Sequence, residues 1–278
     1  MTATPTTRRP RIALMGEFSA GKSTLANLLL GQRVSPVKVT ATQLPPVWYS
    51  FGHESILRVD NSGQTSAIAA SALNGISHHD TQAVRVLLEA EVLEFCDVID
   101  MPGTSDPNMP SEVWQRVLDR ADGVVWCTPA TQAWRQSEAA LWEQLPARLH
   151  ENSLLLITRM DALKSQTDRD RVTARVRRET EGLFRHALPI SLTDALSDPD
   201  NPDVLEQSGA DRFVENLVEL VEALGTPQAD GGAARFEAIG KPEPAPAPVA
   251  PAPPPVDGVV PRRVIPKRVR RAPVSARP

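Results

Sequence analysis

A glycine-rich loop between an apolar run and a helical repeat constrains the fold of this chain more than any other feature. Residues 16–23 read G-E-F-S-A-G-K-S. The apolar run Ile12–Met15 predicts a core strand before the loop, and leucines at helical spacing predict a helix after it that ends near Gly31. Because both flanking elements are present, the pattern favours a phosphate-binding loop over a chance turn.

The residues of this loop have distinct expected roles toward a bound nucleotide. Backbone amides point at the phosphates, Lys22 reaches the β- and γ-phosphates, and the Ser23 hydroxyl ligates Mg²⁺. The residues expected to contact the nucleotide are Gly16, Glu17, Phe18, Ser19, Ala20, Gly21, Lys22, Ser23 and Thr24.

A second motif, D-M-P-G at Asp100–Gly103, follows the apolar run F-C-D-V-I. It places a carboxylate where it can help to hold Mg²⁺ and the Gly103 amide where it can sense the γ-phosphate. Asp-x-Pro-Gly is also a common turn. Its position downstream of a phosphate loop favours a nucleotide switch.

A third motif, T-R-M-D at Thr158–Asp161, follows the run L-L-L-I. Asp161 can accept hydrogen bonds from the ring N–H and the amine of guanine, a donor pattern that adenine lacks. The stem of Arg159 can cover the face of the ring. The alternative is that Asp161 is a helix N-cap.

The segment between the phosphate loop and Val47 is rich in proline, threonine and glutamine, which predicts a mobile loop entering a strand. Either Thr40 or Thr42 can place its hydroxyl and carbonyl near Mg²⁺ and the attacking water. The expected metal ligands are therefore Ser23, Asp100 and one of these two threonines.

Apolar strand-like runs alternate with helical segments along the rest of the chain. The expected strands are Val47–Phe51, Ile56–Asp60, Val84–Leu88, Phe95–Asp100, Val124–Thr128, Leu154–Thr158 and Ala187–Ser191. The expected helices are Ala67–Asn74, Val113–Arg120, Ser137–Leu149, Asp168–Phe184 and Asp211–Leu224. Such alternation predicts an α/β fold, the three-layer α/β/α type of the P-loop NTPases, with a mostly parallel sheet and ligands at the carboxyl ends of its strands.

Charge and proline are unevenly distributed along the chain. Residues 227–278 hold 13 of the 26 prolines, nine Lys or Arg and four Asp or Glu, a net charge of +5 that leaves −9 on residues 1–226 of a chain at −4. The expected organisation is a flexible N-terminus 1–10, a folded domain 11–226, a disordered Pro/Ala-rich linker 227–258 and a basic tail 259–278. The acidic body argues against nucleic acid as a partner of the folded domain.

The tail combines apolar and basic residues, with six Lys or Arg between Arg262 and Arg271. A solvated tail is one interpretation. The others are attachment to an anionic membrane surface, to an acidic protein partner or to nucleic acid. The sequence shows no signal-peptide pattern and no apolar run near the ~20 residues of a membrane span, so we expect a cytoplasmic protein, peripheral at the inner face of the membrane if the tail binds lipid.

Taken in order, these motifs resemble the dynamin superfamily, particularly bacterial dynamin-like GTPases, over residues 11–195. The resemblance rests on G-E-F-S-A-G-K-S-T, the T-x-x-P form of Thr42–Pro45, D-M-P-G and T-R-M-D. The run Trp134–Pro146 also looks like the helix that follows the D-x-x-G strand in those proteins. The resemblance implies a dynamin-type G domain that binds GTP with Mg²⁺ and hydrolyses it to GDP and phosphate.

The resemblance also implies roles for individual residues of the site. It assigns phosphate contacts to Lys22, a catalytic cation to Ser19, switch I to Thr42, switch II to Asp100 and Gly103, guanine recognition to Thr158, Arg159 and Asp161, and the last base-contacting loop to Ser191.

Three features depart from the dynamin pattern. Phe18 stands where conventional dynamins carry a glutamine that orients the attacking water, so a partner or a nucleotide-dependent homodimer is expected to supply what is missing. Arg159 replaces the usual lysine, whose stem it can still match. Long stalk helices are not expected, since the first strand starts at Arg11 and a Pro-rich tail follows Leu224.

Two other functions are alternatives to a GTP-hydrolysing dynamin-like protein. They are a nucleotide switch that hydrolyses little and a ribosome- or RNA-associated P-loop GTPase.

Overall fold

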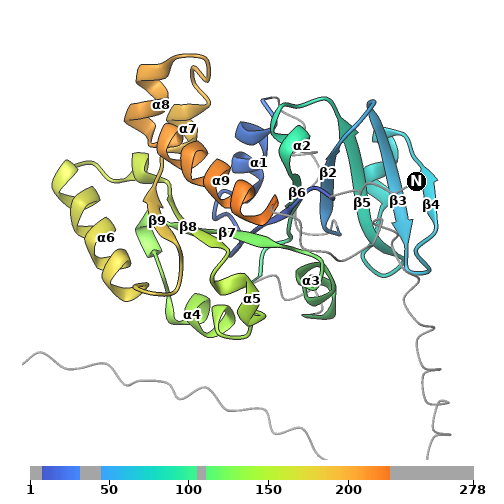
Figure 1. Ribbon diagram of the computed structural model, residues 1–278, viewed down its shortest axis with the longest axis horizontal. Helices are drawn as coiled ribbons and strands as arrows, with labels where there is room; N and C mark the ends of the chain where they lie inside the picture. Colours follow the sequence, from blue (N-terminus) through green and yellow to red (C-terminus); the bar gives the residue numbers. More distant parts are fainter. Residues whose placement is uncertain (1–7, 32–44, 105–110, 226–278) are drawn as a thin grey trace, which may run out of the picture. The chain divides into compact units, whose positions relative to one another are not determined.

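A nine-stranded mixed β-sheet with helices on both faces forms the frame of the computed structural model (Figure 1). The structure describes residues 8–31, 45–104 and 111–225, except for the side chains of residues 74 and 111–114. Outside the described residues lie Thr40, Thr42, the expected linker 227–258 and the expected tail 259–278.

The strands follow the spatial order β4-β3-β5-β2-β6-β1-β7-β8-β9. Their bounds are β1 Arg11–Gly16, β2 Val47–Phe51, β3 Ser55–Asp60, β4 Thr65–Ala67, β5 Thr81–Leu88, β6 Asp97–Asp100, β7 Gly123–Pro129, β8 Ser153–Thr158 and β9 His186–Pro189. Five neighbouring pairs are parallel, and the pairs β2–β6, β3–β4 and β3–β5 are antiparallel.

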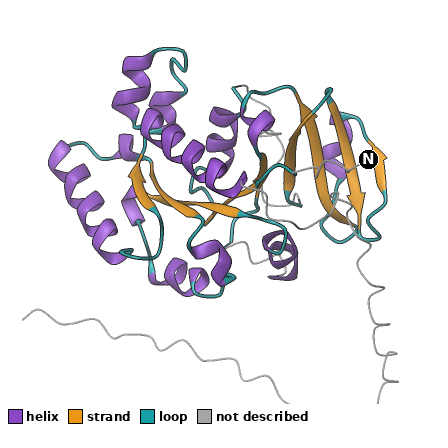
Figure 2. Cartoon of the chain, in the orientation of Figure 1, coloured by secondary structure: helices purple, strands orange, loops and turns teal. Residues whose placement is uncertain are grey.

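Helices and short 3₁₀ turns, labelled η, connect the strands (Figure 2). Their bounds are α1 Lys22–Leu29, η1 Ala70–Gly75, α2 Val92–Phe95, α3 Ser111–Leu118, η2 Ala130–Gln132, α4 Gln136–Trp142, α5 Ala147–His150, η3 Met160–Ala162, α6 Gln166–Glu179, α7 Leu192–Ala195, α8 Pro202–Ser208 and α9 Ala210–Gly225. None of the helices in the described part of the chain is long and apolar enough to span a membrane.

Strand β1 lies inside the sheet and sends side chains into two separate cores. Ile12 and Leu14 join the core beneath α1, α7 and α9, while Ala13 and Met15 join the core beneath α3, α4, α5 and α6 (Figure 1). Because both faces of the strand are covered, its sequence is continuously apolar rather than alternating. The expected three-layer α/β/α fold with a mostly parallel sheet is confirmed.

Strand β2 runs antiparallel to β6, which brings its first residue to the carboxyl end of that strand. Val47 is paired with Asp100 in the register of the two strands. The chain therefore enters β2 beside the aspartate of the D-x-x-G motif.

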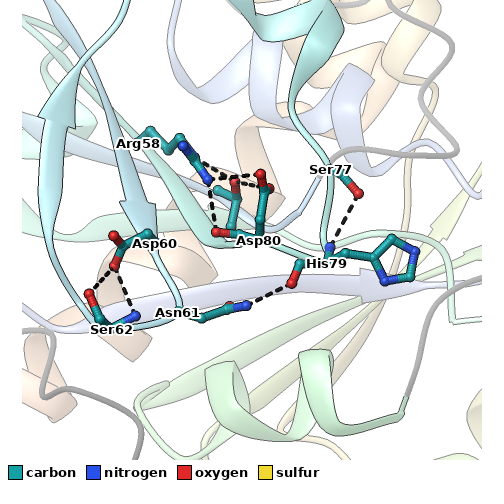
Figure 3. A network of polar contacts seen from close by, with 8 residues as sticks. Arg58, Asp60, Asn61, Ser62, Ser77, His79 and Asp80 are labelled. Atoms are coloured by element: carbon teal, nitrogen blue, oxygen red, sulfur yellow. Dashed lines mark hydrogen bonds and ion pairs between the residues drawn. The ribbon is translucent and has the colours of Figure 1, made fainter. Parts of the chain in front are cut away.

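Polar contacts fix the outer part of the sheet, where β3 meets the turn before β5 (Figure 3). Arg58 donates to the Thr81 hydroxyl at 2.8 Å and forms an ion pair with the Asp80 carboxylate at 3.0 Å. The Asn61 amide donates to the His79 carbonyl at 2.7 Å. These contacts join β3 to the turn before β5.

Several expected elements differ in the structure. The expected strand Phe95–Asp100 begins only at Asp97, because Phe95 ends helix α2 with an exposed ring. The expected helix Ala67–Asn74 is the end of β4 followed by η1, since its small residues build no apolar helix face. The run Trp134–Pro146 follows β7 rather than the D-x-x-G strand, and Pro146 separates α4 from α5.

Candidate functional site

The glycine-rich loop leaves the carboxyl end of β1 and turns into α1 through a strained backbone. Gly16, Ser19 and Gly21 have φ values of 136°, 58° and 96°. A Cβ on Gly16 would lie 2.2 Å from the carbonyl oxygen of Cys127 on β7. Glycine is therefore required where the loop begins, because the loop backbone lies directly against the neighbouring strand.

Lys22 directs its ammonium back into this loop. Its Nζ donates to the carbonyl oxygens of Gly16 at 2.9 Å and Glu17 at 2.8 Å. Burial lowers the pKa of Lys22, and the nearby Asp100 carboxylate opposes that shift. The loop thus encloses a positive charge that is held by backbone carbonyls and available to an anion entering the loop.

Asp100 ends β6 and meets Ser23 of α1. The Ser23 hydroxyl donates to Asp100 Oδ2 at 2.9 Å. Burial raises the pKa of the Asp100 carboxyl, while Lys22 and the Ser23 hydrogen bond act in the opposite direction. Asp100 Oδ1 is buried and has no hydrogen-bond partner among the described residues. A hydroxyl beside a carboxylate with a spare oxygen is the kind of donor set that Mg²⁺ prefers.

The D-x-x-G segment crosses close to the phosphate loop. The backbone N–H of Thr104 donates to the Gly16 carbonyl at 3.2 Å. A Cβ on Gly103 would lie 3.0 Å from the backbone nitrogen of Phe18. Because the two backbones are in contact here, a shift in one segment must displace the other.

The T-R-M-D residues lie at the carboxyl end of β8, next to the same loop. The Thr158 hydroxyl donates to the Ala20 carbonyl at 2.7 Å, which joins two motifs 138 residues apart. Arg159 has a φ of 57°, and this left-handed turn starts η3. The Asp161 Oδ1 accepts from the Ser191 hydroxyl at 3.2 Å, so Ser191 and Asp161 share one surface.

The described residues predicted for the site therefore gather along one edge of the sheet. They are Gly16, Glu17, Phe18, Ser19, Ala20, Gly21, Lys22, Ser23, Thr24, Asp100, Gly103, Thr158, Arg159, Asp161 and Ser191. Thr40 and Thr42 lie outside the described residues. No group of three or more His, Cys, Asp or Glu side chains within the described ranges could hold a metal ion.

Two side chains that contact the loop, those of Arg135 and Ser137, are not among the residues predicted from the sequence. The Glu17 carboxylate accepts from the Ser137 hydroxyl at 2.9 Å and forms an ion pair with Arg135 at 3.1 Å. Glu17 and Ser137 are 120 positions apart in the sequence, a separation close to that of the two motifs above. No local sequence pattern indicates these contacts, because they depend on β1 and β7 becoming neighbours in the sheet.

The fold and the site define the class of this protein, which is a P-loop domain of the GTPase type. The strand, loop and helix at residues 11–29 and the D-x-x-G segment occupy the positions that this fold requires. The profile of the dynamin family matches residues 12–160, and the chain belongs to that family.

Two bacterial relatives illustrate how much of a longer protein the chain represents. It is 24% identical over 221 residues to dynamin-like protein 2 of Campylobacter jejuni, which covers 77% of this chain and 35% of that protein. It is 32% identical over 123 residues to isoniazid-induced protein IniC of Mycobacterium tuberculosis, which covers 41% of this chain and 25% of that protein. The chain thus spans between a quarter and about a third of these relatives.

Two solved structures of an oligomerised bacterial dynamin pair share the fold. They match with TM-scores of 0.62 and 0.58 at 20% identity. The matches cover 80% and 78% of this chain, and 40% and 36% of those chains. At this identity the likeness supports the fold, in agreement with the three-layer arrangement described above.

Proposed function

We propose that the chain binds GTP with Mg²⁺ at this site, hydrolyses it to GDP and phosphate, and changes conformation between the two nucleotide states. The observation that carries this proposal is that hydrogen bonds connect the three motifs. Ser23 donates to Asp100, and Thr158 donates to the loop carbonyl of Ala20. Membership of the dynamin family supports the same conclusion.

The residues present fit Mg²⁺. The unpartnered Asp100 Oδ1 and the Ser23 hydroxyl are oxygen donors beside the loop that would carry the phosphates. Ser23 and Asp100 would hold the ion, together with Thr42 from outside the described residues. When bound, Mg²⁺ would neutralise charge on the β- and γ-phosphates.

The protein's own groups would contribute positioning and charge. The Lys22 ammonium would exchange part of its contact with loop carbonyls for phosphate oxygens, and the loop amides would stabilise charge that develops during transfer. Ser19 would hold a catalytic cation, Thr42 would orient the attacking water, and Gly103 would contact the γ-phosphate. Hydrolysis transfers the γ-phosphoryl group from the β-phosphate oxygen to water and releases GDP and phosphate.

Base selection is assigned to the T-R-M-D side of the site. Asp161 would accept from the ring N–H and the amine of guanine, and the Arg159 stem would lie over the ring. The hydrogen bond that Ser191 donates to Asp161 supports the assignment of both residues to one part of the site.

Competition titration tests the nucleotide assignment. Unlabelled ATP should displace labelled GTP far less well than unlabelled GTP does, because adenine presents the wrong edge to Asp161. Asp161→Asn should reduce the preference for GTP over ATP, and Lys22→Ala should weaken the binding of both nucleotides. The control Asp200→Asn alters an exposed aspartate and should change neither the preference nor the affinities. Equal competition by ATP in the wild type would refute the proposal.

Phe18 favours a second candidate, a nucleotide switch with slow intrinsic hydrolysis. Its apolar ring is 54% exposed, at a position where the family resemblance implies a water-orienting glutamine. Single-turnover hydrolysis of bound GTP separates the two candidates. Turnover that increases with protein concentration would indicate that a homodimer supplies the missing group.

We also propose peripheral attachment of the cytoplasmic protein to the inner face of the membrane through residues 259–278. The basic residues between Arg262 and Arg271 support this, as does the likeness to a bacterial dynamin pair described as sensing and tethering membranes. Co-sedimentation with anionic liposomes should decrease at high salt and on truncation after Gly258, since the attraction is electrostatic. Equal sedimentation with neutral lipid would contradict the assignment, and docking of an acidic protein partner would then be the remaining use of the tail.

A further inference from the structure

The Glu17 carboxylate connects the phosphate loop to the beginning of helix α4 through a hydrogen bond and an ion pair. Its Oε1 accepts from the Ser137 hydroxyl at 2.9 Å, and its Oε2 lies 3.1 Å from Arg135 Nη1. The Glu17 side chain is 14% exposed, so these contacts are partly shielded from water. Both partners lie at the beginning of helix α4, which follows the neighbouring strand β7.

The beginning of α4 is itself fixed to the core. The Arg135 backbone N–H donates to Glu138 Oε2 at 3.0 Å, and Glu138 is 1% exposed. Glu138 also accepts from the Trp126 indole at 3.0 Å and from the Thr128 hydroxyl at 2.9 Å, both on β7. The two groups that hold Glu17 are therefore attached to a rigid element rather than to a loop.

The Glu17 backbone is in turn one of the two groups that hold the Lys22 ammonium. Lys22 Nζ donates to the Glu17 carbonyl at 2.8 Å, and the Ala20 N–H donates to the same carbonyl at 3.2 Å. A rotation of Glu17 would move this carbonyl and with it the lysine and the adjacent turn. The side-chain contacts of Glu17 thus act on a charge that the loop presents to its ligand.

We propose that Glu17 is a positioning residue that ties the phosphate loop to the start of α4 through Arg135 and Ser137 and thereby sets the position of Lys22 for nucleotide binding. This inference rests on the proposed function, because the ligand is the guanine nucleotide. It adds a role for the Glu17 carboxylate, which contacts the beginning of α4. The same contacts give α4 a direct connection to the occupancy of the loop.

A double-mutant cycle tests the tie. The variants are Glu17→Gln, Arg135→Gln and the pair together, and the readouts are the Kd for fluorescently labelled GDP and the unfolding midpoint without nucleotide. The control is Glu179→Gln, which removes the exposed Arg175–Glu179 ion pair of 3.2 Å on α6. The control should leave GDP affinity unchanged.

Each single variant is expected to raise the Kd for GDP by about threefold to tenfold. The double variant should raise this Kd no more than the more damaging single variant does, because both substitutions remove the same contact. The unfolding midpoints should shift as little as in the control, since a partly exposed pair adds little global stability. Wild-type affinity in Glu17→Gln, or independent multiplication of the two effects, would overturn the inference. A wild-type protein that binds no GDP would instead overturn the proposed function.

Discussion

Replacing Glu138 by glutamine removes one acceptor oxygen from a buried network in which three donors share the carboxylate. Glu138 Oε1 accepts from the Trp126 indole, and Oε2 accepts from both the Thr128 hydroxyl and the Arg135 backbone N–H, at 2.9–3.0 Å. A glutamine amide presents one oxygen and one NH₂ group. In the less damaging orientation, the NH₂ group faces the Trp126 N–H, so that a single hydrogen bond is lost and a buried donor is left unpaired.

The expected cost is about 1–3 kcal/mol of unfolding free energy, the penalty for a buried polar group without its partner. Urea denaturation followed by circular dichroism measures it. The control is Glu143→Gln, an exposed residue just after the same helix, which should change stability by no more than about 0.5 kcal/mol. A Glu138→Gln variant within that same margin of the wild type would refute the reasoning.

The pH dependence gives a second readout of this substitution. Burial raises the pKa of Glu138 above its ordinary value of 4.5, so the folded protein retains a proton there that the unfolded chain has lost. Wild-type stability therefore falls as pH rises through the window just above 4.5. Glutamine does not titrate, so the stability of Glu138→Gln lacks this pH dependence. The difference in unfolding free energy between wild type and Glu138→Gln should therefore become smaller from acidic toward neutral pH. A difference that widens with rising pH would show that the sign of the shift is wrong.

Two further predictions concern the loop and the thiols. Gly16→Ala should destabilise the protein by at least about 2 kcal/mol, because its Cβ would lie 2.2 Å from the Cys127 carbonyl. Gly31→Ala, at a φ of 63° with no atom of the described residues within 4 Å of its Cβ, should cost only the backbone strain of about 1–2 kcal/mol. Equal thermal unfolding midpoints for the two variants would argue against the clash at Gly16. Burial raises the pKa of both Cys96 and Cys127 to about 12, so neither should react with Ellman's reagent at neutral pH until the protein unfolds. Rapid labelling of the folded protein would contradict this burial.

The sequence allowed the inner strands to be predicted well, because strands covered on both faces are continuously apolar. The observed β2 has the expected bounds, and β7 and β8 extend the expected strands by one residue or two. Elements without such a signal were missed: β4 is exposed along its whole length, and α8 starts in a polar run at Asn201 and Pro202. Their positions depend on neighbours that the local sequence does not specify.

For the site, three motifs could be recognised because each is a short local pattern, whereas the direction of strand pairing could not. The antiparallel pairing that places Val47 beside Asp100 has no local signature in the sequence of either strand. The contacts of Glu17 with Arg135 and Ser137 depend on which two strands become neighbours. The chemical roles assigned to the site residues remain predictions, which the experiments above address.

The inner position of β1 has a consequence for synthesis on the ribosome. Its two edges pair with β6 and β7, which are completed only at Asp100 and Pro129. At about 5–20 residues per second, the apolar strand waits roughly 6–25 seconds for both partners to be made. Until then Ile12–Met15 is a target for chaperones, and pairing over such long sequence separations is slow. A nascent chain that stops before Gly123 therefore contains every residue of the phosphate loop without the neighbouring strand against which Gly16 must pack.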